Sequence, residues 1–172
     1  LFDRWRADFA DGRPSTSVRF FESLLFSYAG ITPPECTLCE ACGDYVVVEH
    51  NGDVYACDFF VESRWMLGTV TRDRLADLLN SPRQDTFGLM KTDLPQPCRE
   101  CRWLVHCRGG CTKDRIRDRR DGGLNHFCGA FKILFNHADK DFKLLTDSWR
   151  RKSGDEQDRR ARVAMAGPVG RN

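Results

Sequence analysis

The chain of 172 residues is 41% hydrophobic and 30% charged, which is the composition of a soluble globular protein. Its net charge of +2, from 27 basic and 25 acidic residues, is too balanced to favour a nucleic-acid partner. No apolar run approaches the roughly 20 residues that cross a bilayer, and the first residues lack the basic and apolar segments of an export signal. We therefore expect a cytoplasmic protein that binds neither nucleic acid nor membrane.

The first third of the sequence predicts helices and then a hairpin. Residues 1–30 contain two apolar, aromatic-rich stretches with helical spacing, separated by the turn-prone GRPS at 12–15. Their many large rings need a packing partner, which we expect to lie outside this sequence. Between Tyr45 and Cys57, the pair Asn51-Gly52 separates two β-branched or aromatic runs, which predicts a β-hairpin.

The rest of the chain predicts one long helix and several irregular segments. Thr71 is expected to cap a short leucine-rich helix that ends at Pro82. Residues 91–112 are too rich in Pro, Cys and Gly for a long element. From Phe127, apolar residues recur at helical spacing and predict an amphipathic helix of about five turns. The polar residues 147–172 are expected to form a charged, disordered tail.

The most unusual feature of the sequence is its nine cysteines, which without an export signal indicate metal ligands before disulfide bonds. Tetrahedral sets of thiolates select zinc or an iron–sulfur cluster. The first block reads C-x2-C-x2-C-x14-C, and the second reads C-x2-C-x5-C-x3-C-x16-C. The first block contains Cys36, Cys39, Cys42 and Cys57, and the second contains Cys98, Cys101, Cys107, Cys111 and Cys128.

Four thiols in the first block and five in the second cannot form two tetrahedral sites within the blocks without leaving one thiol over. A ligand that crosses between the blocks solves this and would tie the predicted hairpin to the C-terminal region. The gaps also differ from the paired CxxC knuckles of a zinc ribbon. A cubane of iron and sulfide is wider than one zinc ion, so it tolerates long and unequal gaps better.

Basic residues and glycines surround the second block. A cluster bound by four thiolates is anionic, and nearby cations and backbone N–H groups stabilise it. Gly109 and Gly110 would let N–H groups approach sulfur without a Cβ in the way, or would only form a turn. His106 is expected to be structural, because enough thiols are available as ligands. The candidate cations, which would otherwise form a solvated surface, are Arg99, Arg102, Arg108, Lys113 and Arg115.

These residues resemble a known family. The order C-x14-C and then C-x2-C-x5-C-x3-C-x16-C is similar to the SPASM domain that follows the catalytic barrel of many radical S-adenosylmethionine enzymes. Within that group, VYACDFF at 54–60, CRGGC at 107–111 and NHFCGAF at 125–131 resemble the anaerobic sulfatase-maturating enzymes. The resemblance covers roughly residues 1–145.

The resemblance implies an α+β fold, in which a small β-hairpin and helices are organised around two auxiliary [4Fe-4S] clusters. Residues 1–30 would be the end of a radical S-adenosylmethionine (β/α) barrel, 31–146 the SPASM domain and 147–172 the tail. Cys39 has no ligand role in the family, and we favour Cys36 and Cys42 in its place. The first cluster would be held by Cys36, Cys42, Cys57 and Cys111, and the second by Cys98, Cys101, Cys107 and Cys128.

Asp58, directly after Cys57, matches the carboxylate that is proposed as the base in this family. The resemblance implies that the intact protein oxidises a sulfatase Cys or Ser to Cα-formylglycine. A 5′-deoxyadenosyl radical would remove a hydrogen atom, Asp58 would take a proton, and the clusters would accept an electron. Alternatively, Asp58 only caps a turn after the strand. The implied partners are an unfolded or nascent sulfatase polypeptide and a flavodoxin or ferredoxin.

One motif of the family is absent from this sequence. The C-x3-C-x2-C that binds the S-adenosylmethionine cluster does not occur, because the first three cysteines have the wrong first gap. We therefore expect a C-terminal fragment, inactive alone, with S-adenosylmethionine and a third [4Fe-4S] cluster in the missing part. The alternatives are a SPASM domain of another radical S-adenosylmethionine enzyme that modifies peptides or proteins, and a zinc-binding interaction module.

Overall fold

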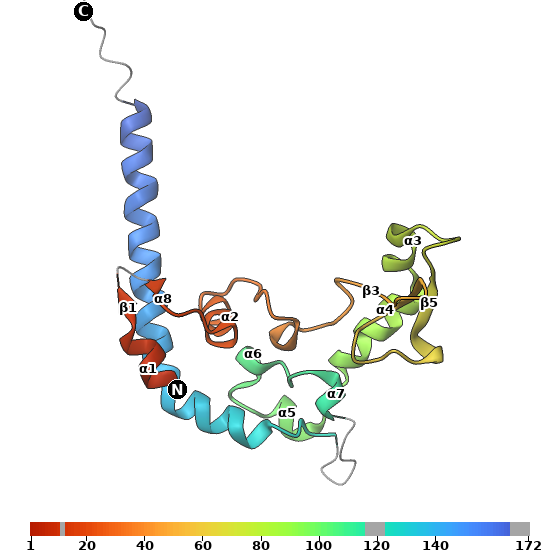
Figure 1. Cartoon of the computed structure of the whole chain (residues 1–172). Helices are drawn as coiled ribbons and strands as arrows, with labels where there is room; N and C mark the ends of the chain where they lie inside the picture. Colours follow the sequence, from red (N-terminus) through yellow and green to blue (C-terminus); the bar gives the residue numbers. More distant parts are fainter. Residues whose placement is uncertain (11–12, 116–122, 166–172) are drawn as a thin grey trace, which may run out of the picture.

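The computed structural model describes the backbone of residues 1–10, 13–115 and 123–165, and side chains as far as residue 152. Helices and two small antiparallel sheets form an elongated molecule (Figure 1). The sheet β3–β4–β5 lies at one end with α3 and α4, and α1, α2 and α8 lie at the other. The short helices α5, α6 and α7 lie between these ends (Figure 1). This mixed architecture confirms the expected α+β class.

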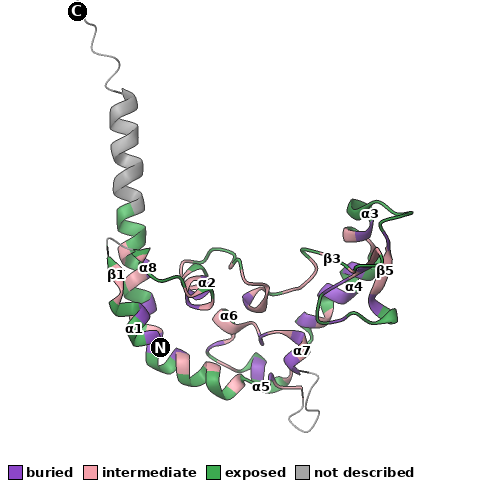
Figure 2. Ribbon diagram, viewed as in Figure 1, coloured by how far each residue is buried: buried purple, intermediate pink, exposed green. Residues whose placement is uncertain are grey.

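The N-terminal region contains the two predicted helices, α1 (Phe2–Ala7) and α2 (Arg19–Tyr28), with the hairpin β1 (Phe9–Ala10) and β2 (Arg13–Pro14) between them. Their rings pack on α8 (Cys128–Met165): the ring of Phe2 lies 5.0 Å from that of Phe142. Phe2, Trp5 and Phe142 are all buried, and Figure 2 shows buried segments on both α1 and α8. The expectation that these rings need a partner outside the sequence was therefore wrong, because α8 supplies much of the surface that covers them.

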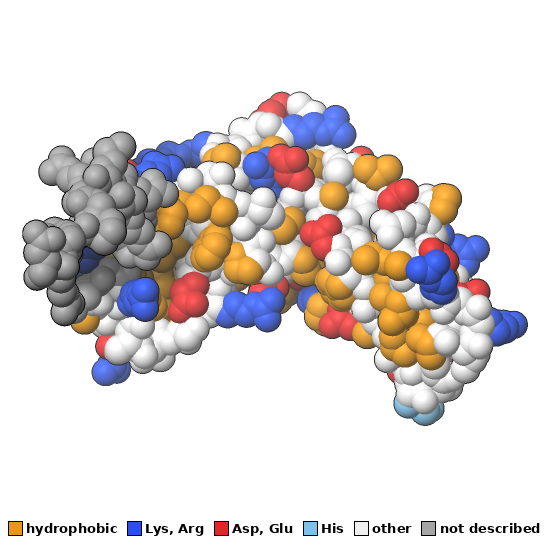
Figure 3. Space-filling view, turned by 90° about the horizontal axis from the view of Figure 1, so that it is seen from above, with side chains coloured by type: hydrophobic (Ala, Val, Ile, Leu, Met, Phe, Trp, Pro, Cys, Tyr) orange, Lys and Arg blue, Asp and Glu red, His pale blue; other side chains and the backbone are white. Residues whose placement is uncertain are grey.

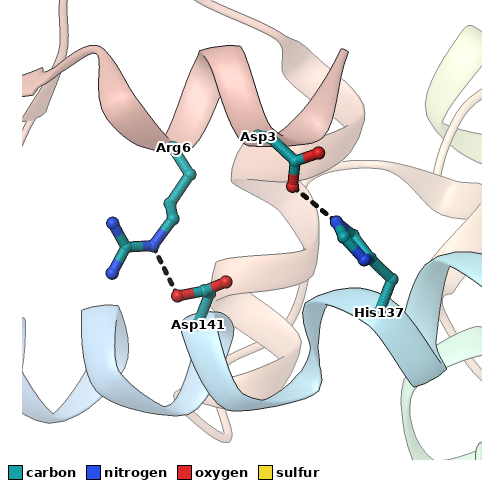
Figure 4. Close-up of polar contacts among 4 residues, drawn as sticks. All are labelled: Asp3, Arg6, His137 and Asp141. Atoms are coloured by element: carbon teal, nitrogen blue, oxygen red, sulfur yellow. Dashed lines mark hydrogen bonds and ion pairs between the residues drawn. The ribbon is translucent and has the colours of Figure 1, made fainter.

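Two ion pairs also join α1 to α8. The Arg6 Nε donates to Asp141 Oδ1 at 2.5 Å, and His137 Nε2 lies 2.5 Å from Asp3 Oδ1 (Figure 4). All four side chains keep a substantial exposed fraction, so water screens these pairs. The aromatic core therefore contributes more than the ion pairs to holding α1 on α8.

The predicted hairpin is confirmed and extended by a third strand. β3 (Val47–Val48) pairs antiparallel with β4 (Asp53–Tyr55), which pairs antiparallel with β5 (Met66–Thr69). Gly52 sits in the turn at φ +88°, a conformation that favours glycine. β5 was not predicted, because it is short and contains Gly68. Beneath the sheet lies a small core built mainly from Ala56, Cys57, Phe60, Trp65 and Phe87.

The predicted caps of the middle helices were wrong in position. α3 (Leu75–Leu79) begins after Arg74 and has no side-chain cap, whereas the Thr71 hydroxyl bonds the Thr69 hydroxyl. Pro82 does not end this helix. It begins the next one, α4 (Pro82–Leu89), where its missing N–H costs nothing and Ser81 caps the first turn.

Residues 91–112 contain only short elements, as predicted.

α8 is longer than the five turns predicted and continues to Met165, inside the segment expected to form the tail. The sequence from 147 to 165 lacks proline and contains five arginines, and arginine is a good helix former even without an apolar face. Residues 166–172 lie outside the described residues. The remaining short elements are η1 (Cys36–Leu38), η2 (Ser63–Trp65), η3 (Met90–Thr92), α5 (Gln96–Arg99), α6 (Leu104–Cys107) and α7 (Thr112–Arg115).

The surface agrees with the balanced charge of the sequence. On the face seen in Figure 3, basic and acidic side chains are interspersed among apolar ones. Within the described ranges, no helix is both long enough and apolar enough to cross a membrane.

Candidate metal centres

Four cysteines from both blocks come together beside the sheet, and we call Cys36, Cys42, Cys57 and Cys111 the first set. Burial raises the pKa of the Cys36 thiol, and the nearby Cys111 and Cys57 raise it further. Burial likewise raises the pKa of Cys42, with Cys36 and Cys111 adding to it. These thiols therefore lie within electrostatic range of one another, and Cys111 crosses from the second block to the first.

Close backbone packing positions the first set. The buried Gln84 of α4 donates from Nε2 to the carbonyls of Gly43, at 3.2 Å, and Tyr45, at 2.8 Å, so it fixes the loop after Cys42. Gly88 packs directly on this loop, because a Cβ there would lie 2.4 Å from the Cys42 carbonyl oxygen. Any side chain at Gly88 would therefore displace Cys42.

The contacts of the Cys39 thiol differ from those of the first set. Its Sγ donates to the carbonyls of Pro33, at 3.4 Å, and Glu35, at 3.7 Å. Burial raises the pKa of Cys39, and the neighbours that modify this shift are Lys91, Asp44, Glu35 and Arg108 rather than cysteines. Cys39 thus bonds main-chain carbonyls, whereas Cys36 and Cys42 have Cys111 as a neighbour.

The other four cysteines line one small cavity, and we call Cys98, Cys101, Cys107 and Cys128 the second set. Apolar rings of Trp103, Phe131 and Phe135 form much of the cavity wall. Burial raises the pKa of Cys107, and the other three cysteines of the set raise it further, whereas the backbone amide of Gly109 lowers it. Four thiols from three short segments therefore face one apolar space.

A left-handed turn brings the two sets close to each other. Arg108, Gly109 and Gly110 have φ values of 48°, 75° and 67°. A Cβ on Gly110 would lie 2.4 Å from Asn125 Nδ2, so glycine is required for this approach. The buried Asn125 in turn donates from Nδ2 to the Cys111 carbonyl at 3.3 Å and accepts from the Phe127 amide at 2.8 Å. It therefore links the turn to the start of α8, where Cys128 lies.

Asp58 lies at the exposed edge of the first set. Its Oδ1 accepts from the Tyr45 hydroxyl at 3.1 Å and from Cys57 Sγ at 3.2 Å. The Tyr45 hydroxyl is also 3.4 Å from Cys57 Sγ. Burial, followed by the contact with Cys57, raises the pKa of Tyr45, so Tyr45 stays a neutral donor. The carboxylate is held in place beside a cysteine and remains open to solvent on its other side.

The basic residues that the sequence analysis expected near the clusters differ in their burial and in their partners. Arg115 is buried, and the nearby Cys98, Cys42 and Cys111 counteract the lowering of its pKa by burial. Lys91, which is also buried, was missed because it lies in neither cysteine block. The other candidates keep part of their side chains exposed and pair with carboxylates or an aromatic ring; they are Arg99, Arg102, Arg108 and Lys113.

His106 has the structural role that was expected. Its Nδ1 lies 3.0 Å from the Ser27 hydroxyl, and its ring stacks on Tyr28 with centroids 3.7 Å apart. Burial lowers the pKa of His106 and so favours a neutral ring. These contacts fix α6 on α2.

Residues 33–102 match the family model of the SPASM domain, described as an iron-sulfur cluster-binding domain. The serine-type anaerobic sulfatase-maturating enzyme of Bacteroides thetaiotaomicron is 37% identical over 141 residues, which are 80% of this chain and 33% of that protein. The cysteine-type enzyme of Clostridium perfringens is 32% identical over 141 residues, which are 80% of this chain and 37% of that protein. The chain spans about a third of the length of these curated relatives.

Solved structures agree with this similarity. Native anSMEcpe with bound AdoMet has a TM-score of 0.75 and 30% identity, and the match covers 86% of this chain and 40% of that chain. Native anSMEcpe with bound AdoMet and Kp18Cys peptide has a TM-score of 0.76 and 29% identity, with 86% and 41% covered. The resemblance expected from the cysteine pattern is confirmed.

Proposed function

We propose that the first and second sets each hold one [4Fe-4S] cluster. The observation that carries this proposal is the second set, in which four thiols face a single cavity with apolar walls. The long and unequal sequence gaps between the cysteines suit a cubane better than a single zinc ion, and the match to a cluster-binding domain supports the proposal.

We further propose that the chain is the C-terminal part of an anaerobic sulfatase-maturating enzyme. Relatives of both the serine type and the cysteine type support this assignment. In it, residues 1–30 end the upstream barrel, 31–146 form the SPASM domain and 147–172 form the tail. The substrate is a sulfatase polypeptide, in line with the peptide-bound neighbour, and a flavodoxin or ferredoxin exchanges electrons with the enzyme.

Asp58 is the base in this proposal. Oxidation of a Ser side chain to an aldehyde, or of a Cys side chain to a thioaldehyde, removes a hydrogen atom, a proton and an electron. Water then converts the thioaldehyde to the aldehyde and releases hydrogen sulfide. The proton goes to Asp58, whose carboxylate is exposed toward solvent and oriented by the Tyr45 hydroxyl. The clusters, when bound, supply one-electron transfer, since four cysteine ligands leave no open iron position for substrate.

The proposal is tested by Asp58→Asn in the longer protein to which we assign the chain. Formylglycine formation in a sulfatase peptide, followed by mass spectrometry, is expected to fall on the order of 10²- to 10⁴-fold, with the visible spectrum of the clusters unchanged. Glu62→Gln changes another exposed carboxylate, four residues further along the chain; it serves as the control and should keep normal activity. Near-normal formylglycine formation by Asp58→Asn would refute the assignment of the base.

A further inference from the structure

A fully buried lysine lies beside the first set. Lys91 of η3 has 0% relative exposure, and its Nζ donates to the carbonyls of Cys36 and Thr37, at 3.0 Å for the latter. Among the residues that the structure describes, Lys91 has no carboxylate partner. The ionisable groups around it are instead the thiols of Cys42, Cys36, Cys39 and Cys111, which become anionic when they bind a metal.

A buried arginine connects Lys91 to the second set. Arg115 is 5% exposed, and its guanidinium donates to the carbonyls of Lys91, at 2.7 Å, and Asp93, at 3.0 Å. It lies against Gly109, which lines the cavity of the second set: a Cβ on Gly109 would be 3.8 Å from Arg115 Cζ. Its Nε is buried and has no hydrogen-bond partner among the described residues.

These two cations need a counter-charge. Transfer of an unpaired ammonium or guanidinium group from water into a protein interior is strongly unfavourable unless an anion compensates it. Main-chain carbonyls satisfy hydrogen bonds of Lys91 and Arg115 but carry no net charge. The ionisable groups near the two side chains are members of the two cysteine sets, together with Cys39 beside Lys91 and the carboxylate of Asp93 near Arg115. The Asp93 side chain is 92% exposed and pairs with Arg99, so water screens it. A thiolate-bound cluster is anionic and buried, so it supplies the compensation that this exposed carboxylate does not.

We propose that Lys91 and Arg115 form a buried cationic bridge between the two sets, with Lys91 compensating the charge of the first cluster and Arg115 that of both clusters. This inference rests on the two clusters of the proposed function. Reduction adds negative charge to a cluster, and a nearby buried cation stabilises the reduced form. Lys91 and Arg115 therefore raise the reduction potentials of the clusters, and the charge of Arg115 acts on both clusters.

The test is a redox titration of the 172-residue chain, reconstituted with iron and sulfide without oxygen and followed by electron paramagnetic resonance. Lys91→Gln and Arg115→Gln remove the charges but keep hydrogen-bond donors. Lys91→Gln is expected to lower one midpoint potential, and Arg115→Gln both. Each reduction equilibrium constant should fall about tenfold or more, which is about 59 mV for a one-electron step.

The control is Arg99→Gln. Arg99 adjoins Cys98 in sequence, but its side chain is 60% exposed, so its removal should leave both potentials unchanged. If Lys91→Gln or Arg115→Gln binds less iron, Lys91→Arg and Arg115→Lys show whether the missing charge is the cause. Retention of iron by these charge-keeping variants supports the bridge, and equal loss of iron by them overturns it. Unshifted potentials in fully loaded Lys91→Gln and Arg115→Gln, or an equal shift in Arg99→Gln, also overturn it.

The failure of this inference differs from the failure of the proposed function. A chain that takes up zinc without sulfide refutes the clusters and the bridge together, before any variant is made. A longer protein with intact clusters that does not form formylglycine refutes the maturase assignment and leaves the bridge supported or overturned by the titration alone.

Discussion

The two cysteine sets differ in what surrounds them. The first set packs through Cys42 and Cys57 on the small core beneath the sheet, and its outer edge carries the polar Tyr45 and Asp58. The second set packs through Cys101 and Cys107 on the large aromatic core of α1, α2 and α8. The first set thus has a polar, exposed edge, whereas the second set faces a cavity with aromatic walls.

This difference indicates a division of labour. A site that meets a polypeptide substrate must present its base to solvent, as Asp58 does at the edge of the first set. A site that only passes electrons gains from apolar walls, because burial keeps water and oxygen away from the cluster and tunes its potential. We therefore propose that proton transfer to Asp58 occurs at the edge of the first set, and that the second set passes electrons onward.

Removal of both clusters is expected to have the largest effect. Ligand binding in small metal-dependent domains contributes on the order of 10 kcal/mol, which is similar to the whole ~5–15 kcal/mol stability of a typical domain. Metal-free chain would also leave Lys91 and Arg115 buried without counter-charge. We expect it to lose cooperative thermal unfolding, measured by circular dichroism. A cooperative, native-like transition in metal-free protein would contradict this.

A pair of serine variants tests membership of the first set. Cys42→Ser is expected to lower the iron content from about eight to about four per chain, because the first cluster loses a ligand and the second keeps all of its own. Cys39→Ser is the matched control and should retain all the iron, since its Sγ bonds main-chain carbonyls. Iron loss in Cys39→Ser with retention in Cys42→Ser would reverse the assignment.

The apolar wall of the second set is tested by Phe135→Ala. Phe135 is fully buried and lines the cavity, so we expect the substitution to cost about 3–5 kcal/mol of folding free energy. In air, the visible absorption of the second cluster should decay faster while that of the first is unchanged. Phe59→Ala, which removes a ring that is 57% exposed, should alter stability by less than about 0.5 kcal/mol. Equal decay in the two variants would show that the rings do not protect the cluster.

The ion pairs between α1 and α8 are expected to have the smallest effect. Asp3→Asn and Arg6→Gln should each change the free energy of unfolding by no more than about 1 kcal/mol (Figure 4), with the iron content unchanged. Denaturant unfolding of the loaded chain measures this. A larger loss would mean that the ion pairs, rather than the aromatic core, hold the N-terminal region on α8.

Much of the fold could be predicted from local signals in the sequence. The Asn51-Gly52 turn and the apolar spacing after Phe127 predicted the hairpin and α8 correctly, because turn chemistry and helical periodicity act over a few residues. The caps at Thr71 and Pro82 were misplaced, since a residue that starts one helix also fits the end of another. The packing of α1 on α8 depends on residues more than 130 positions apart, as Asp3 and His137 illustrate.

The cysteines stood out in the sequence, but the charges around them did not. Cysteine spacing indicated two sites joined by a crossing ligand, whereas the family resemblance implied that this ligand is Cys111 and which cysteines belong to each set, and these assignments stay predictions. Lys91 was missed because no pattern distinguishes a buried lysine from the many exposed ones. Of the five cations beside the cysteines in sequence, only Arg115 is buried. Proximity in sequence therefore did not predict which cations reach the sulfur.

The most direct test of the account is the iron, sulfide and zinc content of the chain, purified and reconstituted without oxygen, together with its visible spectrum. Two clusters predict about eight irons and eight sulfides per chain with a brown absorption. A colourless chain with stoichiometric zinc and no sulfide would contradict the account and leave a zinc-binding interaction module in its place.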